Sequence, residues 1–501
     1  MADANDGEAE GGRQPDPPSS AGGAWRWLRL SWSTVWIVAA FVLVCWVHLW
    51  RLGTEGVVTD ENAYRRAGSQ YVQGVFRVNL EHPPLAKELI GSAEVLFGRS
   101  WTAVRLPSAL AGIATAAVLC AWATRAAGPW AGLAAVVLWG LVPQRAGLPG
   151  LLDLSIPTRV DRFALLEPLA TLFSALALWA GWEWMTRRTL RWAVVAGLAT
   201  GFAAAAKAPG VLVAPAIVGF AIWAGWKSPR RLAGHLAAYA AAGLGAAAIA
   251  YAPFGFHAAF HQLDYMFAFQ SRHAQEGHSI YLAGKIYSHP PWWAGLSFQT
   301  LGYGWAITVA GAGAIAAALF AARHRSGVAY ALAAAVSVYV VLNLAVGLQL
   351  SFYYLLWQPA LVFAAAMGVE ALLRGGRERL LLLPLGGLVL VPVVAFGVRL
   401  ATLGPGPYER AAELAACGRR CVANVVGYPG VLKDYLPPGA VVRAGLPRDG
   451  LPPDLVVADP SLTIRRPDLA VAVDEWGAMA VGLGYRHVTL DGLDVWVLPP
   501  A

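Results

Sequence analysis

Two adjacent acidic residues, Asp60 and Glu61, stand where the first long apolar segment of the chain gives way to a polar stretch. They follow Thr59, a residue type that often caps the amino terminus of a helix. A carboxylate partly removed from water is suited to accept a proton from a hydroxyl group, so the pair predicts a general base. The alternative is an ordinary first helical turn, where the helix dipole stabilises acidic side chains.

A second cluster, Glu81-His82-Pro83-Pro84, follows in the same polar stretch, with Lys87 just beyond it. The two prolines suit the start of a helix, while neighbouring Glu and His side chains also suit metal coordination or hydrogen bonds that orient a metal's ligands. Both interpretations stay open. Apolar residues at helical spacing predict two surface helices, after Thr59 and from Pro83, which would hold the two clusters near one another at a membrane interface.

Further charged and aromatic residues lie beside other apolar segments. The run at 158–173, TRVDRFALLEPLATLF, places several charges at the mouth of a span, where they face either a cavity or each other. Basic side chains elsewhere could bind a phosphate, and aromatic ones could bind a sugar, although interface anchoring and core packing are the alternatives. Together, the charged and aromatic candidates for substrate binding in these regions are Arg159, Asp161, Arg162, Lys207, Arg272, Lys285, Trp292, Tyr353 and Tyr354.

The composition requires an apolar solvent for most of the chain. Of 501 residues, 57% are hydrophobic and 14% are charged, with a mean hydropathy of +0.51, which exceeds what a soluble core needs. A helix of about 20 residues crosses a bilayer, and about eleven such segments recur. They lie near 34–51, 106–124, 129–148, 164–185, 191–206, 210–226, 233–253, 297–321, 328–347, 353–373 and 380–400.

Basic residues fall in every second short connection, which predicts that those connections are cytoplasmic. The amino terminus is then inside, and residues 52–105, 149–163, 254–296 and everything after 401 are external. The net charge of +8 therefore reports membrane topology, and no nucleic-acid partner is expected. The basic connections contain Arg187, Arg188, Arg191, Lys227, Arg230, Arg231, Arg323, Arg325, Arg374, Arg377 and Arg379.

Three regions follow from these patterns: a disordered cytoplasmic tail at 1–30, an all-α polytopic membrane domain at 31–404, and a small external α/β domain at 405–501. In the last region, short β-branched runs at 421–426, 440–444, 454–459 and 493–498 alternate with helical stretches near 408–417 and 475–483.

The four cysteines divide into two kinds. Cys45 and Cys120 lie in apolar segments and suit core packing, whereas Cys417 and Cys421 lie in the external domain, where a disulfide is permitted. Their spacing does not decide whether the disulfide forms.

Five motifs follow one another along the chain: Asp60-Glu61, HPPLAK (82–87), RFALLEPLATLF (162–173), SHPPWW (288–293) and FYYLLWQPAL (352–361). In these motifs the chain resembles the polyprenyl-phosphate-dependent C-type glycosyltransferases, in particular the protein O-mannosyltransferases and the aminoarabinose transferases acting on lipid A. This resemblance implies a helical membrane domain with an outward-opening cavity and a polyprenyl-phosphate sugar as donor.

Carried over by position, the resemblance makes Asp60 the base that deprotonates the acceptor hydroxyl, with Glu61 supporting it or binding substrate. It sets Glu81 and His82 beside the donor head group. Where relatives use a divalent metal, Glu81 would bind it together with a loop histidine such as His257 or His261. Asp161 and Arg162 would line the same cavity, with a basic side chain steadying the phosphate.

The resemblance thus implies an inverting transferase on the external face of the plasma membrane, with membrane lipids as neighbours. The sugar-binding β-trefoil domain of the fungal and animal relatives is absent here, which leaves open whether the acceptor is a protein, a lipid or a polysaccharide. Two other functions remain: a glycan ligase or phosphotransferase, and a transporter or flippase of lipid-linked glycans. A transporter predicts ionisable groups at mid-bilayer, yet here they gather at the ends of the spans.

Overall fold

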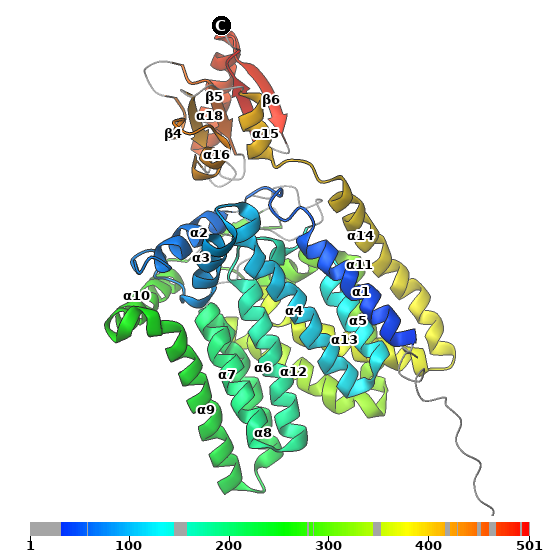
Figure 1. The fold of residues 1–501 in the computed structure, drawn as a ribbon. Helices are drawn as coiled ribbons and strands as arrows, with labels where there is room; N and C mark the ends of the chain where they lie inside the picture. Colours follow the sequence, from blue (N-terminus) through cyan, green and yellow to red (C-terminus); the bar gives the residue numbers. More distant parts are fainter. Residues whose placement is uncertain are drawn as a thin grey trace, which may run out of the picture.

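The computed structural model is a bundle of long helices that carries a small domain with a mixed sheet at one end (Figure 1). The expected tail at 1–30 lies outside the described residues. The structure describes residues 32–57, 59–144, 158–277, 280–283, 285–343, 352–415, 421–427, 429–447, 452–459, 467–490 and 493–499.

Eleven helices of the described residues lie where the sequence predicts spans. By length and composition, six stretches are apolar enough to cross a membrane, and α5 with η2, α7 and α12 are shorter apolar helices. The eleven are α1 (Trp32–Leu49), α4 (Trp101–Ala127), α5 (Pro129–Val136) with the π-helical turn η2 (Val137–Leu141), α6 (Glu167–Arg187), α7 (Leu190–Ala206), α8 (Ala214–Gly225) with the preceding 3-10 turn η4 (Ala208–Val213), α9 (Pro229–Tyr251), α11 (Ala294–Phe320), α12 (Arg325–Val341), α13 (Gln358–Arg374) and α14 (Leu382–Thr402).

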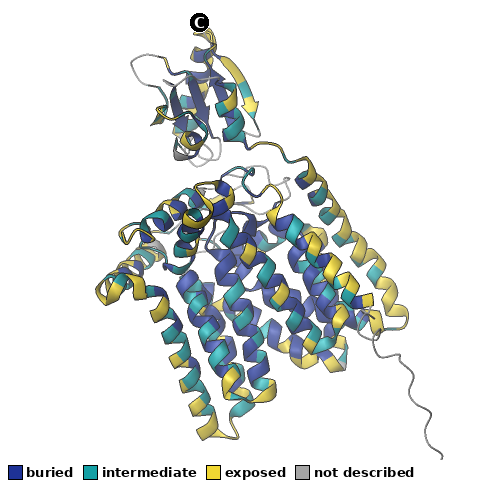
Figure 2. Cartoon of the chain, viewed as in Figure 1, coloured by how far each residue is buried: buried dark blue, intermediate teal, exposed yellow. Residues whose placement is uncertain are grey.

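Apolar side chains cover the outer surface of the bundle, while small residues fill its helix contacts. Leu383, Leu390 and Val391 on α14 are all exposed, which suits contact with lipid (Figure 2). At the contact of α7 with α9, a Cβ atom on Gly197 would clash with the backbone of Tyr239. Close backbone approach at small residues is typical of helices that pack within a membrane.

Two surface helices, α2 (Thr59–Tyr71) and α3 (Leu85–Phe97), lie across one end of the bundle (Figure 1). Both begin where the sequence predicts. They cross at a glycine pair, because a Cβ on Gly68 would lie 2.8 Å from the backbone nitrogen of Gly91. This close crossing fixes the start of α2 relative to the loop that precedes α3.

The segment between α9 and α11 contains more regular structure than its sequence suggests. It contains helix α10 (Gly255–Glu276) and an antiparallel hairpin of β1 (Ile280–Leu282) and β2 (Lys285–Tyr287). Two 3-10 turns also matter for the site: η3 (Val160–Arg162), before α6, and η8 (Tyr353–Leu356), before α13.

The carboxyl-terminal domain has a five-stranded sheet in the order β4-β3-β5-β7-β6. The four predicted strands are present, with β3 parallel to β4 and β5, and β7 antiparallel to β5 and β6. Strand β6 was not predicted, because its sequence RHVTL is polar and mostly exposed. The elements are α15 (Pro407–Leu414), β3 (Val422–Val426), α16 (Pro429–Tyr435), β4 (Val441–Ala444), β5 (Leu455–Ala458), α18 (Pro467–Gly482), β6 (Arg486–Leu490) and β7 (Leu493–Val497).

The cysteines follow the expected division where they are described. Cys45 and Cys120 are free thiols, and Cys421 is disulfide-bonded. Cys417 lies outside the described residues.

Candidate active site

Asp60 lies half-buried in the first turn of α2. Its negative charge acts on Tyr64, one turn further along α2, on Lys207, between α7 and η4, and on Tyr353, at the start of η8. Three segments that are far apart in the sequence therefore meet around this carboxylate.

Lys207 is buried, and burial lowers the pKa of its ammonium group to about 7, while the negative charge of Asp60 opposes that shift. Its ammonium group forms an ion pair with Glu167, the first residue of α6, and lies 5.2 Å from the ring centroid of Phe352 and 4.6 Å from that of Tyr353. Aromatic faces stabilise a cation by several tenths of a kcal/mol to about 2 kcal/mol. The second carboxylate oxygen of Glu167 has no hydrogen-bond partner among the described residues. The carboxylate of Asp60 and the ammonium group of Lys207 thus lie in one region of the protein.

Tyr64 connects Asp60 to the Glu81-His82 cluster. Its ring meets that of His82 edge-on, with centroids 5.8 Å apart. Burial raises the pKa of Tyr64 well above its ordinary value, and the charges of Asp60 and Glu81 raise it further, so the hydroxyl stays protonated and can donate a hydrogen bond. Glu81 is half-buried and accepts a hydrogen bond from the Asn79 side chain at 2.7 Å. The two clusters are therefore neighbours.

Glu61 lies wholly inside the protein, unlike the adjacent Asp60. Arg105 of α4 donates to both of its carboxylate oxygens, at 2.8 and 2.9 Å, and the backbone of Ala164 donates to it at 2.7 Å. Arg105 also donates to the carbonyl oxygens of Leu52, Glu55 and Gly56. This arrangement ties the loop between α1 and α2 and the segment before α6 to α4.

A second buried network holds the other predicted charges. Asp161 accepts two hydrogen bonds from Arg159, at 2.9 and 2.6 Å, and lies 3.1 Å from Nε2 of His48. Burial would raise the pKa of Asp161, but the charges of Arg159 and His48 outweigh it and hold that pKa well below its usual range. Arg162 pairs with Glu55. These side chains are buried and bonded to the protein, so they are placed to support the site from within.

Lys87 also makes its hydrogen bonds inside the protein. Its ammonium group donates to the hydroxyl of Tyr71 at 3.0 Å and to the carbonyl oxygens of Asn79 and His82 at 2.5 and 2.6 Å. Burial lowers the pKa of Lys87 to about 7, while the nearby charges of Glu81 and Glu88 oppose that shift. Lys87 therefore fastens the loop that contains Glu81 and His82 onto α3.

The remaining candidates are more dispersed. Arg272, Lys285 and Trp292 are exposed, on α10, on β2 and in the turn before α11. Tyr354 is buried, and its ring meets that of Tyr303 edge-on at 5.6 Å. The hydroxyl of Tyr354 has no hydrogen-bond partner in the part of the chain that the structure describes.

The proposed metal ligands do not form a recognisable set. His257 and His261 are exposed on α10, and the α10 residue that reaches the Glu81-His82 loop is Gln262, which donates to the carbonyl oxygen of His82 at 2.5 Å. Within the described ranges, no group of three or more His, Cys, Asp or Glu side chains could hold a metal ion.

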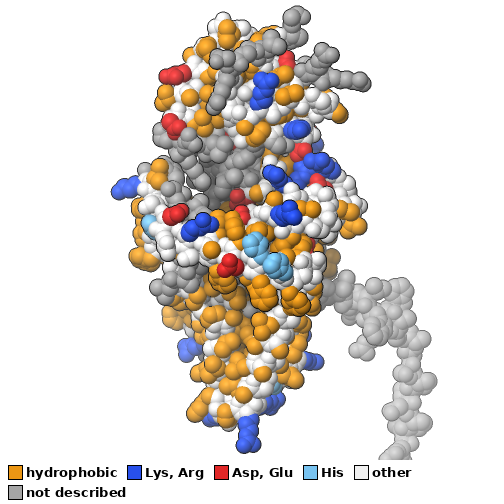
Figure 3. Space-filling model, turned by 90° about the vertical axis from the view of Figure 1, so that its left-hand side faces the viewer, with side chains coloured by type: hydrophobic (Ala, Val, Ile, Leu, Met, Phe, Trp, Pro, Cys, Tyr) orange, Lys and Arg blue, Asp and Glu red, His pale blue; other side chains and the backbone are white. Residues whose placement is uncertain are grey.

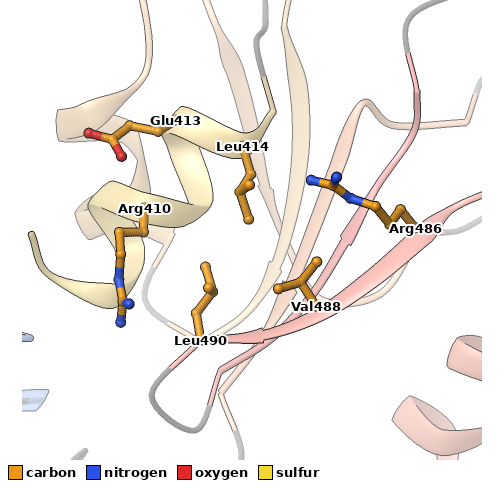
Figure 4. Close-up of a pocket in the computed structure, with 6 residues that line it drawn as sticks. All are labelled: Arg410, Glu413, Leu414, Arg486, Val488 and Leu490. Carbon is orange, nitrogen blue, oxygen red and sulfur yellow. The ribbon is translucent and has the colours of Figure 1, made fainter.

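A pocket of about 460 Å³ lies in the carboxyl-terminal domain, between α15 and β6 (Figure 4). Its walls are Arg410, Glu413, Leu414, Arg486, Val488 and Leu490. None of these six residues is aromatic, so the pocket does not reproduce the arrangement around Asp60 and Lys207, which includes Tyr64 and Tyr353.

Two residues that the sequence did not single out emerge as part of the site. Tyr64 was assigned only to the apolar face of its helix, and Arg105 was placed at the end of the stretch 52–105, directly before the predicted span 106–124. A signal for Arg105 exists, because an arginine at the edge of an apolar span usually has a partner. For Tyr64 the sequence holds no such signal.

Known proteins resemble this chain in sequence over one stretch and in fold over most of its length. Residues 81–254 match the profile of the family described as dolichyl-phosphate-mannose-protein mannosyltransferase. A search of curated protein sequences found no match. The crystal structure of ArnT from Cupriavidus metallidurans bound to undecaprenyl phosphate is similar, with 18% identity, a TM-score of 0.57, and coverage of 93% of this chain and 98% of that one.

The apo form of the same ArnT gives 16% identity and a TM-score of 0.52 over 93% of this chain and 97% of that one. An oligosaccharyltransferase from Archaeoglobus fulgidus gives 13% identity and a TM-score of 0.53 over 83% and 64%. The chain therefore has a multi-span fold similar to that of ArnT, and its residues 81–254 match the sequence profile of the dolichyl-phosphate-mannose-protein mannosyltransferase family.

Proposed function

We propose that this protein transfers a sugar from a polyprenyl-phosphate-linked donor to the hydroxyl group of an acceptor. The observation that carries the proposal is the meeting of Asp60 with Lys207 beside the buried ring of Tyr353. Glycosyl transfer from a lipid phosphate needs a base for the acceptor proton and a cation near the departing phosphate. The ArnT of the same fold binds undecaprenyl phosphate, which supports a donor of that class.

In the proposed reaction, Asp60 accepts the proton of the acceptor hydroxyl while the oxygen of that hydroxyl attacks the anomeric carbon of the donor sugar. The bond from that carbon to the phosphate oxygen breaks, and its electron pair leaves with the polyprenyl phosphate. Attack from the face opposite the phosphate inverts the anomeric configuration. Lys207 would stabilise the negative charge that develops on the phosphate, since a fixed cation in a dry site acts strongly.

The other site residues would have supporting roles. Glu61 would position Asp60 by anchoring the first turn of α2 to Arg105. Tyr64 and the Glu81-His82 cluster would contact the donor head group or the acceptor. The exposed residues Arg272, Lys285 and Trp292 would meet substrate only at the rim. A metal enters no step of this scheme.

We also propose that the site faces the outside of the plasma membrane. The connections rich in Lys and Arg join the ends of helices that lie opposite α2 and α3 (Figure 1), and such loops are usually cytoplasmic. Residues 31–404 would then form the transferase domain, and residues 405–501 an external domain.

The direct test incubates the purified protein with a panel of polyprenyl-phosphate sugars and candidate acceptors, followed by mass analysis. The proposal predicts that one donor is consumed, that the whole phosphate stays on the lipid, and that the product has the opposite anomeric configuration. Phosphate appearing on the product would indicate a phosphotransferase instead. Counterflow of labelled lipid-linked sugar in vesicles, without any covalent change, would indicate a transporter.

A further inference from the structure

A groove of about 740 Å³ opens between α6, α8, α9 and α12. It involves the carboxyl-terminal ends of α6 and α8 and the amino-terminal ends of α9 and α12, so it lies at the end of the bundle opposite α2 and α3 (Figure 1). It is therefore distinct from the region around Asp60.

Aromatic side chains form the inner wall of this groove. The ring of Tyr330 lies 5.6 Å from that of Trp182 and 5.0 Å from that of Phe220, and its hydroxyl donates to the carbonyl oxygen of Leu178 at 2.8 Å. Trp223 lies further out on α8 and is 73% exposed. The wall is thus rigid inside and apolar toward the bilayer.

Cations form the rim. Arg188, Lys227 and Arg231 line the groove and are exposed, and no carboxylate forms an ion pair with any of them among the described residues. Arg231 donates to the backbone oxygen of Arg188 at 2.5 Å, which brings the two residues together. The one carboxylate in the sequence from 182 to 235, Glu183, is already paired with Arg125 and Arg187.

The charge pattern extends over this end of the molecule. Figure 3 shows a hydrophobic surface along the bundle with Lys and Arg side chains at its lower end, and no acidic side chains gather there on that face. A bilayer places lipid phosphates at the depth where a span ends and acyl chains immediately below. From the end of the bundle inward, the groove likewise presents cations first and aromatic rings next.

We propose that this groove binds an anionic phospholipid. The phosphate would lie between Lys227 and Arg231, and an acyl chain would run along Trp223 and Phe220 toward the ring of Tyr330. Basic pockets between spans are suited to anionic head groups, and each cation near the surface contributes about 1 kcal/mol. Free phosphate would use the rim alone, whereas a lipid uses the rim and the aromatic wall together.

The test is native mass spectrometry of the detergent-solubilised full chain, titrated with phosphatidylglycerol or with phosphatidylcholine. Wild type should retain phosphatidylglycerol about 30-fold more strongly than phosphatidylcholine, if each of the two cations contributes about 1 kcal/mol. The double variant Lys227→Gln/Arg231→Gln should lose this preference. The matched control Arg191→Gln/Arg230→Gln removes the same charge from the same end of the bundle, outside the groove, and should keep the preference.

Two further measurements distinguish a lipid bound in the groove from free phosphate bound at its rim. Trp223→Ala should weaken retention of both lipids, and inorganic phosphate should not displace bound phosphatidylglycerol. Displacement by phosphate together with unchanged binding by Trp223→Ala would identify a site for free anions and overturn the proposal. Equal phosphatidylglycerol retention by the groove variant and wild type would also overturn it. If the double variant is unfolded by its melting profile, the exposed single change Lys227→Gln takes its place, with Arg230→Gln as control.

Discussion

The carboxylate of Glu61 accepts two hydrogen bonds from the guanidinium of Arg105, at 2.8 and 2.9 Å, and neither side chain is exposed. The negative charge of the preceding residue, Asp60, instead raises the pKa of Lys207 and of Tyr353. Of two adjacent acids with similar chemistry, one holds the loop in place and the other lies in the candidate site.

Replacing Glu61 by Gln should therefore damage the fold as well as the reaction. Removing one partner of a buried ion pair leaves the other charge uncompensated and costs about 3–5 kcal/mol. We expect a clearly lower Tm by differential scanning fluorimetry, together with loss of transfer. The exposed control Glu276→Gln should change neither quantity. An unchanged Tm for Glu61→Gln would show that the pair does not anchor the loop.

Gly112 in α4 should tolerate no side chain. A Cβ there would lie 2.7 Å from the carboxyl carbon of Asp161 and 2.8 Å from Nε2 of His48, and would push these groups apart. Gly112→Ala is expected to lower Tm by several degrees, since overpacking costs about 1–3 kcal/mol. The matched control is Gly219→Ala in α8, where no atom lies within 4 Å of the new Cβ. Equal Tm values for the two variants would contradict the buried network.

Lys207 rather than an exposed cation should serve the donor phosphate. Lys207→Gln is expected to reduce kcat/KM for the lipid-phosphate donor by about 10- to 100-fold, the effect of losing one hydrogen bond to a charged group. Because this change also removes the ion-pair partner of buried Glu167, Tm should fall as well, so kcat/KM is measured below the Tm of the variant. Lys285→Gln, on the exposed strand β2, should leave kcat/KM within about two-fold of wild type. The opposite ranking of these two variants would move the phosphate site to the hairpin.

Lys87 should make the stability of the protein depend on pH in a specific direction. Burial lowers its pKa from 10.5 to about 7 in the folded protein, so the unfolded chain binds more protons between those values. Stability from this group then rises with pH across that window, by up to about 1.4 kcal/mol per pH unit. The Tm of wild type should rise relative to that of Lys87→Met between pH 7 and pH 9. A constant difference would mean that Lys87 keeps an ordinary pKa.

The fold was largely predictable because each membrane span appears in the sequence as a long run of apolar residues. All eleven expected segments coincide with helices, and the starts of α2 and α3 follow from Thr59 and the proline pair. Strand β6 escaped prediction because RHVTL lacks a buried face that would give an apolar pattern.

The site was only partly predictable, because its geometry depends on contacts between distant segments. The sequence identified Asp60, Lys207 and Tyr353 separately, but nothing in their spacing shows that α2, the end of α7 and η8 converge. Arg159, Asp161 and Arg162 were singled out as charges at the mouth of a span. Whether such charges face substrate or each other is decided by partners such as His48, far away in the chain.

The most direct measurement is the turnover of Asp60→Asn with the preferred polyprenyl-phosphate sugar. This change keeps the size of the side chain and removes its basicity, and general-base catalysis is typically worth about 10²- to 10⁴-fold in rate. The account predicts a loss of kcat in that range, with Tm and donor binding close to wild type. Undiminished turnover by Asp60→Asn would contradict the assignment of Asp60 as the base.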